Sequence, residues 1–178
     1  LYTEQLLEGL QIPLCRNWQQ VETAYTQGNL AFIPLGDWAP QLQRMIDLRN
    51  TLGLRSPIHS LARLLNPLNA RCGLQSIFHP GYQGVHRDAS GLLGDNVIVV
   101  KGDGGEIEIN PDTLSHLYGT TGGQSWDEEW PALSDQRHVK PATLEPEHLK
   151  ALWRGDVEDS YPQLALIATM ALALRGLG

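Results

Sequence analysis

The chain has 178 residues, 42% of them hydrophobic, and a formal net charge of −7 at pH 7. A chain of this length folds as one domain or a large part of one, and it buries roughly two thirds of its unfolded surface. It has no apolar run of membrane length, and its two cysteines, Cys15 and Cys72, are too few for a disulfide framework or a zinc cluster. We therefore expect two reduced cysteines, a cytoplasmic protein and no membrane partner.

The first half of the chain is expected to be mostly helical. Asn17 is a candidate N-cap for a helix that Gly28 ends. Asp37 is a candidate N-cap for a long helix that Gly53 ends, and Pro57 begins a further helix. The helices expected here are residues 3–10, 18–26, 38–52 and 57–66, and the apolar run at 30–34 is expected to be a buried strand.

The second half alternates strands with helices. Val97-Ile98-Val99-Val100 is the strongest strand signal because four β-branched residues follow one another. The other expected strands are 74–78 and 106–109, and the expected helices are 82–93, 146–154 and 161–174. Residues 111–143 are rich in Gly, Pro, Thr, Ser and acids, and we expect loops with brief structure there. This alternation predicts an α/β fold with a mostly parallel sheet flanked by helices.

Basic residues concentrate in one segment. Five of the thirteen Lys and Arg residues lie between Arg44 and Arg71, where Asp47 is the only acid. Such a cluster in an acidic protein predicts a local site for an anion: a carboxylate, a phosphate or a nucleic-acid backbone. The residues expected to form this site are Arg44, Arg49, Arg55, His59 and Arg63. In the alternative interpretation, Arg49 and Arg55 pair with carboxylates near the core, and His59 and Arg63 lie on a solvated helix face.

Acidic residues dominate a later region. From residue 103 to residue 159 the chain carries thirteen Asp or Glu residues and four Lys or Arg residues. The sharpest part is the run Asp127-Glu128-Glu129 between two tryptophans. Such a run is typical of a solvated acidic surface. The alternatives are a contact with a metal or another cation, or a surface that repels nucleic acid.

Two stretches resemble one enzyme family. The segment Arg49-x-x-Leu-Gly-Leu-Arg55-Ser, followed by Leu64-Leu-Asn-Pro67, is similar to the R-x-x-L-G-[FIV]-R-T-x-F-N-L-L-G-P-L-x-N-P region of anthranilate phosphoribosyltransferases, which are of the glycosyltransferase family 3 type. The segment Val99-Val-Lys-Gly-Asp-Gly-Gly-Glu-Ile-Glu108 is similar to their V-V-H-G-x-D-G-L-D-E segment. The resemblance implies a phosphoribosyltransferase-like fold. In it, this chain would be the C-terminal portion, residues 38–66 would contribute helices to a small helical subdomain, and the N-terminal half would lie outside the chain.

Several positions of the family pattern are changed. The family's histidine in an H-P-A-M stretch is replaced by Ala39, and the metal-binding D-E pair reads Ile107-Glu108. Glu108 is then the one carboxylate of this pair left for magnesium, because an isoleucine supplies no oxygen ligand. Arg49 matches the arginine that binds the substrate carboxylate and is kept. The changes should weaken the stabilisation of departing pyrophosphate.

This pattern, with the added charge of Arg63, is similar to the divergent YbiB-type branch of the family. Resemblance to that branch implies a homodimer that binds DNA and lacks the parent activity. We therefore expect sequence-independent binding of nucleic acid through contacts to phosphates, with no cofactor. The acidic net charge argues against this function. The alternative is pentosyl transfer from phosphoribosyl diphosphate to anthranilate or another acceptor, which would need Mg and which Arg49 and Glu108 favour.

Overall fold

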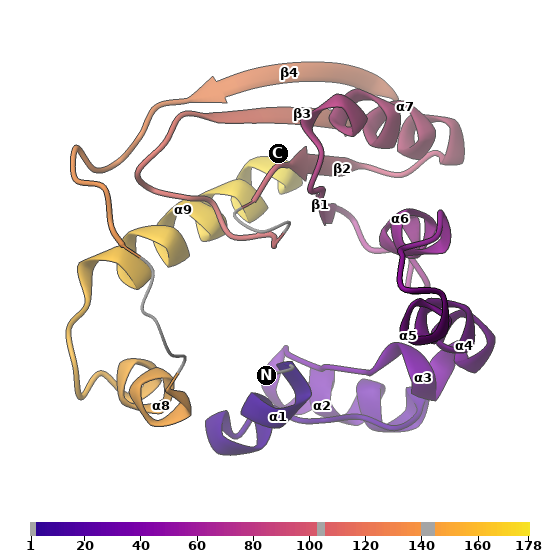
Figure 1. Ribbon diagram of the computed structural model, residues 1–178, viewed down its shortest axis with the longest axis horizontal. Coiled ribbons are helices and arrows are strands. Elements are labelled where there is room, and N and C mark those ends of the chain that lie inside the picture. The colour runs from indigo at the N-terminus through magenta and orange to yellow at the C-terminus, as the bar shows by residue number, and fades with distance from the viewer. Residues whose placement is uncertain (1–2, 103–105, 140–144) are drawn as a thin grey trace. The chain divides into compact units, whose positions relative to one another are not determined.

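The computed structural model describes residues 3–102, 106–139 and 145–178. The chain divides into two compact units, whose elements are labelled in Figure 1. The helical unit comprises Leu1–His59 and Lys140–Glu158, and the sheet unit comprises Ser60–Val139 and Asp159–Gly178. The α/β class predicted from the sequence is confirmed, because helices flank a four-stranded sheet.

The helical unit is built from short helices around a small core of Cys15, Val21 and Ala24. Its longest helix, α2 (Trp18–Gly28), begins as the sequence predicts, since the Asn17 side chain accepts a 2.9 Å hydrogen bond from the backbone N–H of Gln20. Both cysteines are free thiols, as expected. The other helices are α1 (Thr3–Leu7) with a 3₁₀ turn at Glu8–Leu10, α3 (Leu35–Trp38), α4 (Pro40–Asp47), α5 (Arg49–Leu52) and α8 (Pro146–Arg154). Helix α6 (Ile58–Leu61) follows at the boundary with the sheet unit, and a 3₁₀ turn at Ala62–Leu64 extends it.

The strand expected at residues 30–34 is not formed. Leu14 and Phe32 share a single isolated parallel bridge, in which Cys15 N–H donates to Phe32 and Phe32 N–H donates to the carbonyl of Pro13. The next hydrogen bonds on either side of this bridge would need the N–H groups of residues 13 and 34. Both residues are prolines, which have no backbone N–H, so the ladder cannot extend.

The long helix expected at 38–52 is broken. Ala39 has φ −137° and ψ 63°, and α4 begins anew at Pro40. The physical reason is the proline, because the residue before a proline avoids the α region. Asp37 lies inside α3 instead of capping a helix, and its carboxylate accepts a 2.9 Å hydrogen bond from Arg16. Gly53 ends the last part, α5, as predicted, with φ 70°.

The sheet has the strand order β1 (Gly73–Ser76), β2 (Val97–Val100), β3 (Ser115–Thr121) and β4 (Gln124–Trp130). β1 and β2 are parallel and are joined through a 3₁₀ turn (Pro80–Tyr82) and α7 (Gln83–Leu93), whereas the β2–β3 and β3–β4 pairs are antiparallel. The sheet is therefore mixed, and the expected parallel arrangement holds for its first pair. Gly122 and Gly123, with φ 58° and 78°, close the β3–β4 hairpin, because tight hairpin turns favour two positive φ angles.

The expectation of loops with only brief structure at residues 111–143 is corrected, because this stretch holds β3 and β4, each of seven residues. Polar and acidic residues conceal these strands in the sequence. The strand expected at 106–109 is not formed either. The N–H of Ile109 donates to the Thr169 hydroxyl at 3.0 Å instead of to a neighbouring strand.

The strand β2 is the buried central strand that the sequence predicts, and each of its residues is at most 3% exposed. Its side chains alternate between the two faces of the sheet. Ile98 and Val100 pack against Ala168 and Leu172 of α9 (Ser160–Leu177), while Val97 and Val99 face the side covered by α7. Helices therefore lie on both faces of the sheet, as Figure 1 shows.

Candidate functional site

Three arginines of the expected anion site are exposed on the helical unit. Arg44 lies in the last turn of α4, Arg49 begins α5, and Arg55 lies beyond the end of α5. We call these three residues the arginine segment. Within the described residues, none of the three forms an ion pair or a side-chain hydrogen bond. The neighbouring carboxylate, Asp47, accepts a 2.8 Å hydrogen bond from Gln43 instead. The three positive charges are therefore available to an anion.

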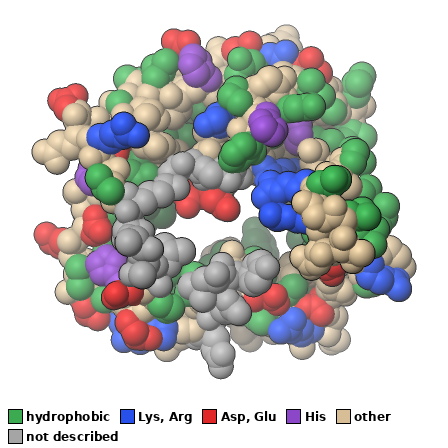
Figure 2. Space-filling model, viewed as in Figure 1, with side chains coloured by type: hydrophobic (Ala, Val, Ile, Leu, Met, Phe, Trp, Pro, Cys, Tyr) green, Lys and Arg blue, Asp and Glu red, His purple; other side chains and the backbone are tan. Residues whose placement is uncertain are grey.

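The surroundings of the arginine segment are apolar. Met45, Leu48, Leu52 and Leu54 are 43–63% exposed. On the face drawn in Figure 2, exposed hydrophobic side chains lie among interspersed basic and acidic residues. A guanidinium group tolerates apolar neighbours because it is more weakly hydrated than an ammonium group. An anion that approaches the arginine segment meets three guanidinium groups without ion-pair partners among the described residues, and Asp47 is the one carboxylate in the sequence between Arg44 and Arg55.

His59 and Arg63, the other two residues expected at this site, are turned into the protein. Nδ1 of His59 lies 3.2 Å from the backbone nitrogen of Ser56, and its Nε2 is buried without a hydrogen-bond partner among the described residues. Arg63 belongs to the sheet unit, where its guanidinium donates to the carbonyl oxygen of Ser76 and lies 3.5 Å from the hydroxyl. Because β1 is the terminal strand of the sheet, Arg63 covers a backbone acceptor on its open edge.

The expected magnesium ligand, Glu108, is exposed, whereas Ile107 packs against the core beneath α9. Over residues 3–102, 106–139 and 145–178, no three His, Cys, Asp or Glu side chains gather in a way that could hold a metal ion. Magnesium takes about six oxygen ligands in octahedral geometry. Glu108 is the one carboxylate of the resembled pair, so a magnesium ion there would be held largely by water or phosphate oxygens.

The acidic run of β4 connects the sheet to its two helices. Asp127 accepts a hydrogen bond from Arg87 of α7, and Glu128 accepts a 3.0 Å hydrogen bond from Nε of Arg175 in α9. The Arg175 guanidinium also lies 4.2 Å from the centroid of the Trp126 ring. The hydrogen bonds that Arg175 donates hold the pKa of the Glu128 carboxyl group below its usual value. Both carboxylates therefore have structural partners, and they point to different helices.

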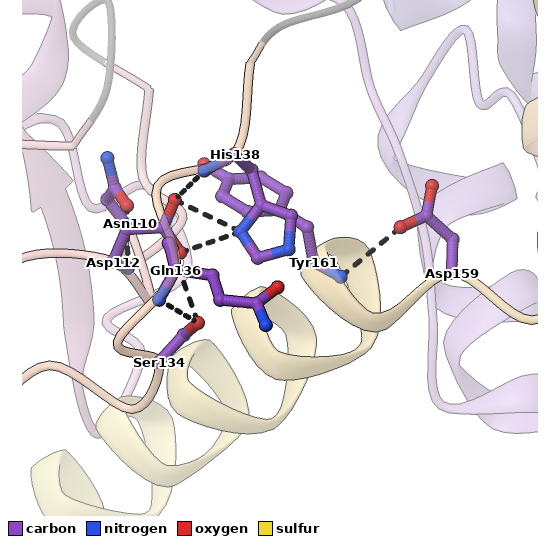
Figure 3. Close-up of polar contacts among 7 residues, drawn as sticks. All are labelled: Asn110, Asp112, Ser134, Gln136, His138, Asp159 and Tyr161. Atoms are coloured by element: carbon purple, nitrogen blue, oxygen red, sulfur yellow. Dashed lines mark hydrogen bonds and ion pairs between the residues drawn. The ribbon is translucent and has the colours of Figure 1, made fainter.

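A nearly buried aspartate–histidine pair lies in the stretch that was expected to be loops (Figure 3). The Asp112 side chain is 7% exposed and accepts a 2.7 Å hydrogen bond from the backbone N–H of His138, whose Nδ1 lies 2.9 Å from the same carboxylate. The imidazole packs against Tyr161 at the start of α9, with 4.9 Å between ring centroids. Burial opposes ionisation of Asp112, but the hydrogen bonds from His138 outweigh it and lower the pKa of the carboxyl group.

A carboxylate that orients a histidine is an arrangement also used for general-base chemistry. One half of the pair has a local sequence signal, because the Asn110 side chain accepts a 2.9 Å hydrogen bond from the Asp112 N–H in an Asx turn. The other half does not, since no local pattern connects Asp112 with a histidine on a distant loop. Sequence analysis therefore missed the pair.

A second missed cluster lies under α7, which buries the polar residues Gln83, His86 and Ser90. Nδ1 of His86 lies 3.2 Å from Oε1 of Gln75, whose Nε2 donates a 3.1 Å hydrogen bond to the Ser90 hydroxyl. Burial, and then the positive charge of Arg63, lower the pKa of His86. The neutral imidazole is therefore the favoured form in the folded protein.

Sequence comparison finds relatives, although no family model matches the chain. An uncharacterized protein of Aquifex aeolicus is 35% identical over 85 residues, which cover 47% of this chain and 28% of that protein. The uncharacterized protein YbiB of Escherichia coli is 27% identical over 117 residues, 65% of this chain and 37% of YbiB. The anthranilate phosphoribosyltransferase of Synechococcus sp. is 31% identical over 120 residues, 67% of this chain and 35% of the enzyme. The chain thus spans about a third of the length of these curated relatives.

Comparison of folds points to the same enzymes. Anthranilate phosphoribosyltransferase from Saccharomyces cerevisiae matches with a TM-score of 0.73 at 16% identity, over 96% of this chain and 52% of the enzyme chain. A structure of the yeast enzyme in complex with PRPP and Mg matches with a TM-score of 0.71. The chain therefore has this fold over about half the length of the yeast enzyme. Sequence and fold together support the anthranilate phosphoribosyltransferase-like superfamily for this chain, with similarity to YbiB as well as to the enzymes.

Proposed function

We propose that the protein binds nucleic acid without sequence preference, as a cytoplasmic homodimer that has lost phosphoribosyl transfer. The observation that carries the proposal is the arginine segment, whose three exposed guanidinium groups have no carboxylate partner within the described residues. In this proposal the chain is the C-terminal portion of the fold. Residues 38–66 contribute to a helical subdomain, and the rest of the protein supplies the other half.

Free guanidinium groups suit a phosphate backbone. Each can donate two hydrogen bonds to one phosphate, and each neutralised phosphate releases condensed counterions. The resulting affinity does not depend on sequence and weakens with salt. The net charge of −7 opposes binding, but salt screens exposed charges over about 8–10 Å. The partners of Asp127 and Glu128 also neutralise part of the acidic surface locally.

Two positions support the loss of catalysis. Ile107 packs into the core where the resembled motif has a metal-binding carboxylate, and Ala39 lies at the break between α3 and α4 where the motif has a histidine. Without the carboxylate and the histidine, the departing pyrophosphate loses electrostatic stabilisation. No cofactor is therefore part of the proposal.

The test is binding of the full-length protein to two duplex DNAs of unrelated sequence, measured by fluorescence anisotropy at several salt concentrations. We expect similar affinities for both duplexes. The variant Arg44→Ala, Arg49→Ala, Arg55→Ala should bind both more weakly, with a log–log salt slope shallower by about 0.9 for each phosphate contact removed. Arg16→Ala is the matched control for the single variant Arg55→Ala, because each removes one positive charge and Arg16 is already paired with Asp37.

Unchanged affinity and slope in the folded triple variant would mean that the arginine segment does not bind DNA. Equal weakening by the single variants Arg16→Ala and Arg55→Ala would mean that only the net charge matters. A double variant, Arg55→Ala with Arg63→Ala, separates two arginines that the sequence grouped together. Since Arg63 donates to Ser76, we expect the double variant to lose no more affinity than Arg55→Ala alone.

A second candidate function is pentosyl transfer, which the similarity to anthranilate phosphoribosyltransferases favours. Under that function, Arg49 would bind the acceptor carboxylate, and Glu108 would be a ligand of magnesium. The measurement is loss of anthranilate fluorescence with the full-length protein, phosphoribosyl diphosphate and Mg. We expect no turnover. A rate of roughly 1 per second or more, as in ordinary enzymes, would establish the second function instead.

A further inference from the structure

Helix α9 presents its small side chains to the sheet. Its buried residues are Ala165, Ala168, Leu172 and Gly176. The last of these lies so close to β1 that an added Cβ would be 2.2 Å from the sulfur of Cys72. Apart from Leu172, the inner face of α9 carries small residues, which let the helix approach the sheet closely, and most of its larger side chains lie elsewhere.

The larger side chains form an apolar stripe on the outer face of α9. These residues are 48–67% exposed and recur at helical spacing: Leu166, Ile167, Met170, Leu174 and Leu177. The outer face of a helix in a soluble protein is normally polar, and a helix that is apolar all round is normally buried on all sides. Among the described residues, no helix combines the length and apolarity needed to cross a bilayer. An exposed apolar stripe of this kind is typical of a surface that another element covers.

Helix α7, on the opposite face of the sheet, also exposes large apolar side chains, and it buries polar ones. Gln83, His86 and Ser90 are buried against the sheet, while Val85 and Leu92 are exposed. Large apolar side chains therefore point outward on both helices. Domains bury such faces by adding a further layer of secondary structure.

We propose that an apolar helix of the same polypeptide, from the half of the fold outside these residues, packs along Leu166, Met170 and Leu174. The length of the yeast enzyme supports this occupant, because the match covers 96% of this chain but 52% of that enzyme. The stripe contains no charged residue, and Arg175 beside it is already paired with Glu128. The face of the covering helix that meets this stripe is therefore apolar rather than acidic or basic.

The first test is thiol labelling of the full-length variants Leu174→Cys and Val139→Cys with a maleimide, with mass spectrometry to locate the label. Both positions are open to solvent in this structure, at 67% and 91% exposure. We expect the L174C thiol to react at least about tenfold more slowly, because labelling must await local opening. Equal rates would overturn the proposal. Protection that disappears on dilution would assign the stripe to a second copy of the chain and would also overturn it.

A second pair of variants tests the energetic consequence. Met170→Lys in the full-length protein should lower Tm by about 4 °C or more, because a charge would be buried against the covering helix. Val139→Lys, the control, should leave Tm unchanged. An unchanged Tm for Met170→Lys would mean that the stripe faces water. These variants leave the arginine segment intact, so failure here and failure of nucleic-acid binding are separate results.

Discussion

The sheet unit and the arginine segment of the helical unit use the same side chain in opposite ways. In the sheet unit, Arg175 binds Glu128 and lies over the Trp126 ring, and Arg87 binds Asp127 and lies 5.7 Å from the centroid of an aromatic ring. The arginine segment has neither kind of partner within the described residues. What an arginine contacts, rather than how many arginines a stretch contains, therefore indicates whether it stabilises the fold or is free to bind.

The largest effect on the sheet-unit side of this comparison is expected from Gly119→Ala. An added Cβ would lie 2.1 Å from the Trp126 ring, so the indole would have to leave its place beneath Arg175. We expect the free energy of unfolding to fall by about 2–3 kcal/mol in urea titrations. Gly84→Ala is the control, since its Cβ would meet no atom closer than 4.0 Å. Equal losses in both variants would argue against a specific role for the stacked tryptophan.

Arg175→Ala should have the next largest effect. The variant loses a partly exposed ion pair and a cation–π contact, which together are worth about 1–2 kcal/mol. A double-mutant cycle with Glu128→Gln in urea titrations isolates the ion pair from the stacking. A coupling energy near zero would mean that Arg175 acts only through Trp126.

His86 should make the stability of the sheet unit depend on pH. The pKa of His86 is lowered in the folded protein. The unfolded chain therefore binds more protons than the folded protein when the pH falls below the ordinary histidine value of about 6.5. Stability should therefore be lost as the pH falls through that value, and the loss should level off below the folded pKa. Urea titrations between pH 8 and pH 5 measure it. His86→Gln should flatten the dependence, whereas a variant of the exposed His79 should keep it.

The smallest effect on stability is expected from the arginine segment. Arg44→Ala, Arg49→Ala and Arg55→Ala should each change the free energy of unfolding by less than about 0.5 kcal/mol, because exposed residues without partners contribute little. Circular dichroism with urea titration is the measurement. A loss above about 1 kcal/mol in any of them would mean that this arginine stabilises the fold, as Arg87 and Arg175 do in the sheet unit.

Sequence patterns predicted those parts of the fold that depend on local chemistry. The cap at Asn17, the helix end at Gly53 and the buried strand β2 are all present. The breaks at Ala39 and Pro34 also have local causes, since both arise from proline, although the apolar pattern continues across them.

The remaining features depend on partners that lie far apart in the sequence. β4 looks like a charged loop because its carboxylates are matched by arginines on α7 and α9. The Asp112–His138 pair joins a turn to a distant loop. In the sequence, Arg63 looks like one more basic residue of the cluster, but in the fold its guanidinium donates to the backbone carbonyl of Ser76. No local pattern encodes these pairings, which follow from the strand order and the helix positions.

The order of the two units along the chain has a consequence for biosynthesis. The helical unit is discontinuous, because α8 belongs to it but follows the whole of β1 to β4 in the sequence. On the ribosome, residues 1–59 must therefore wait until the residues from Ser60 to Val139 have been translated before α8 can join them. The sheet unit also waits, since α9 follows α8 in the sequence. Each unit is thus completed only after residues of the other unit have been translated, and the early helices of the helical unit stay without α8 during that time.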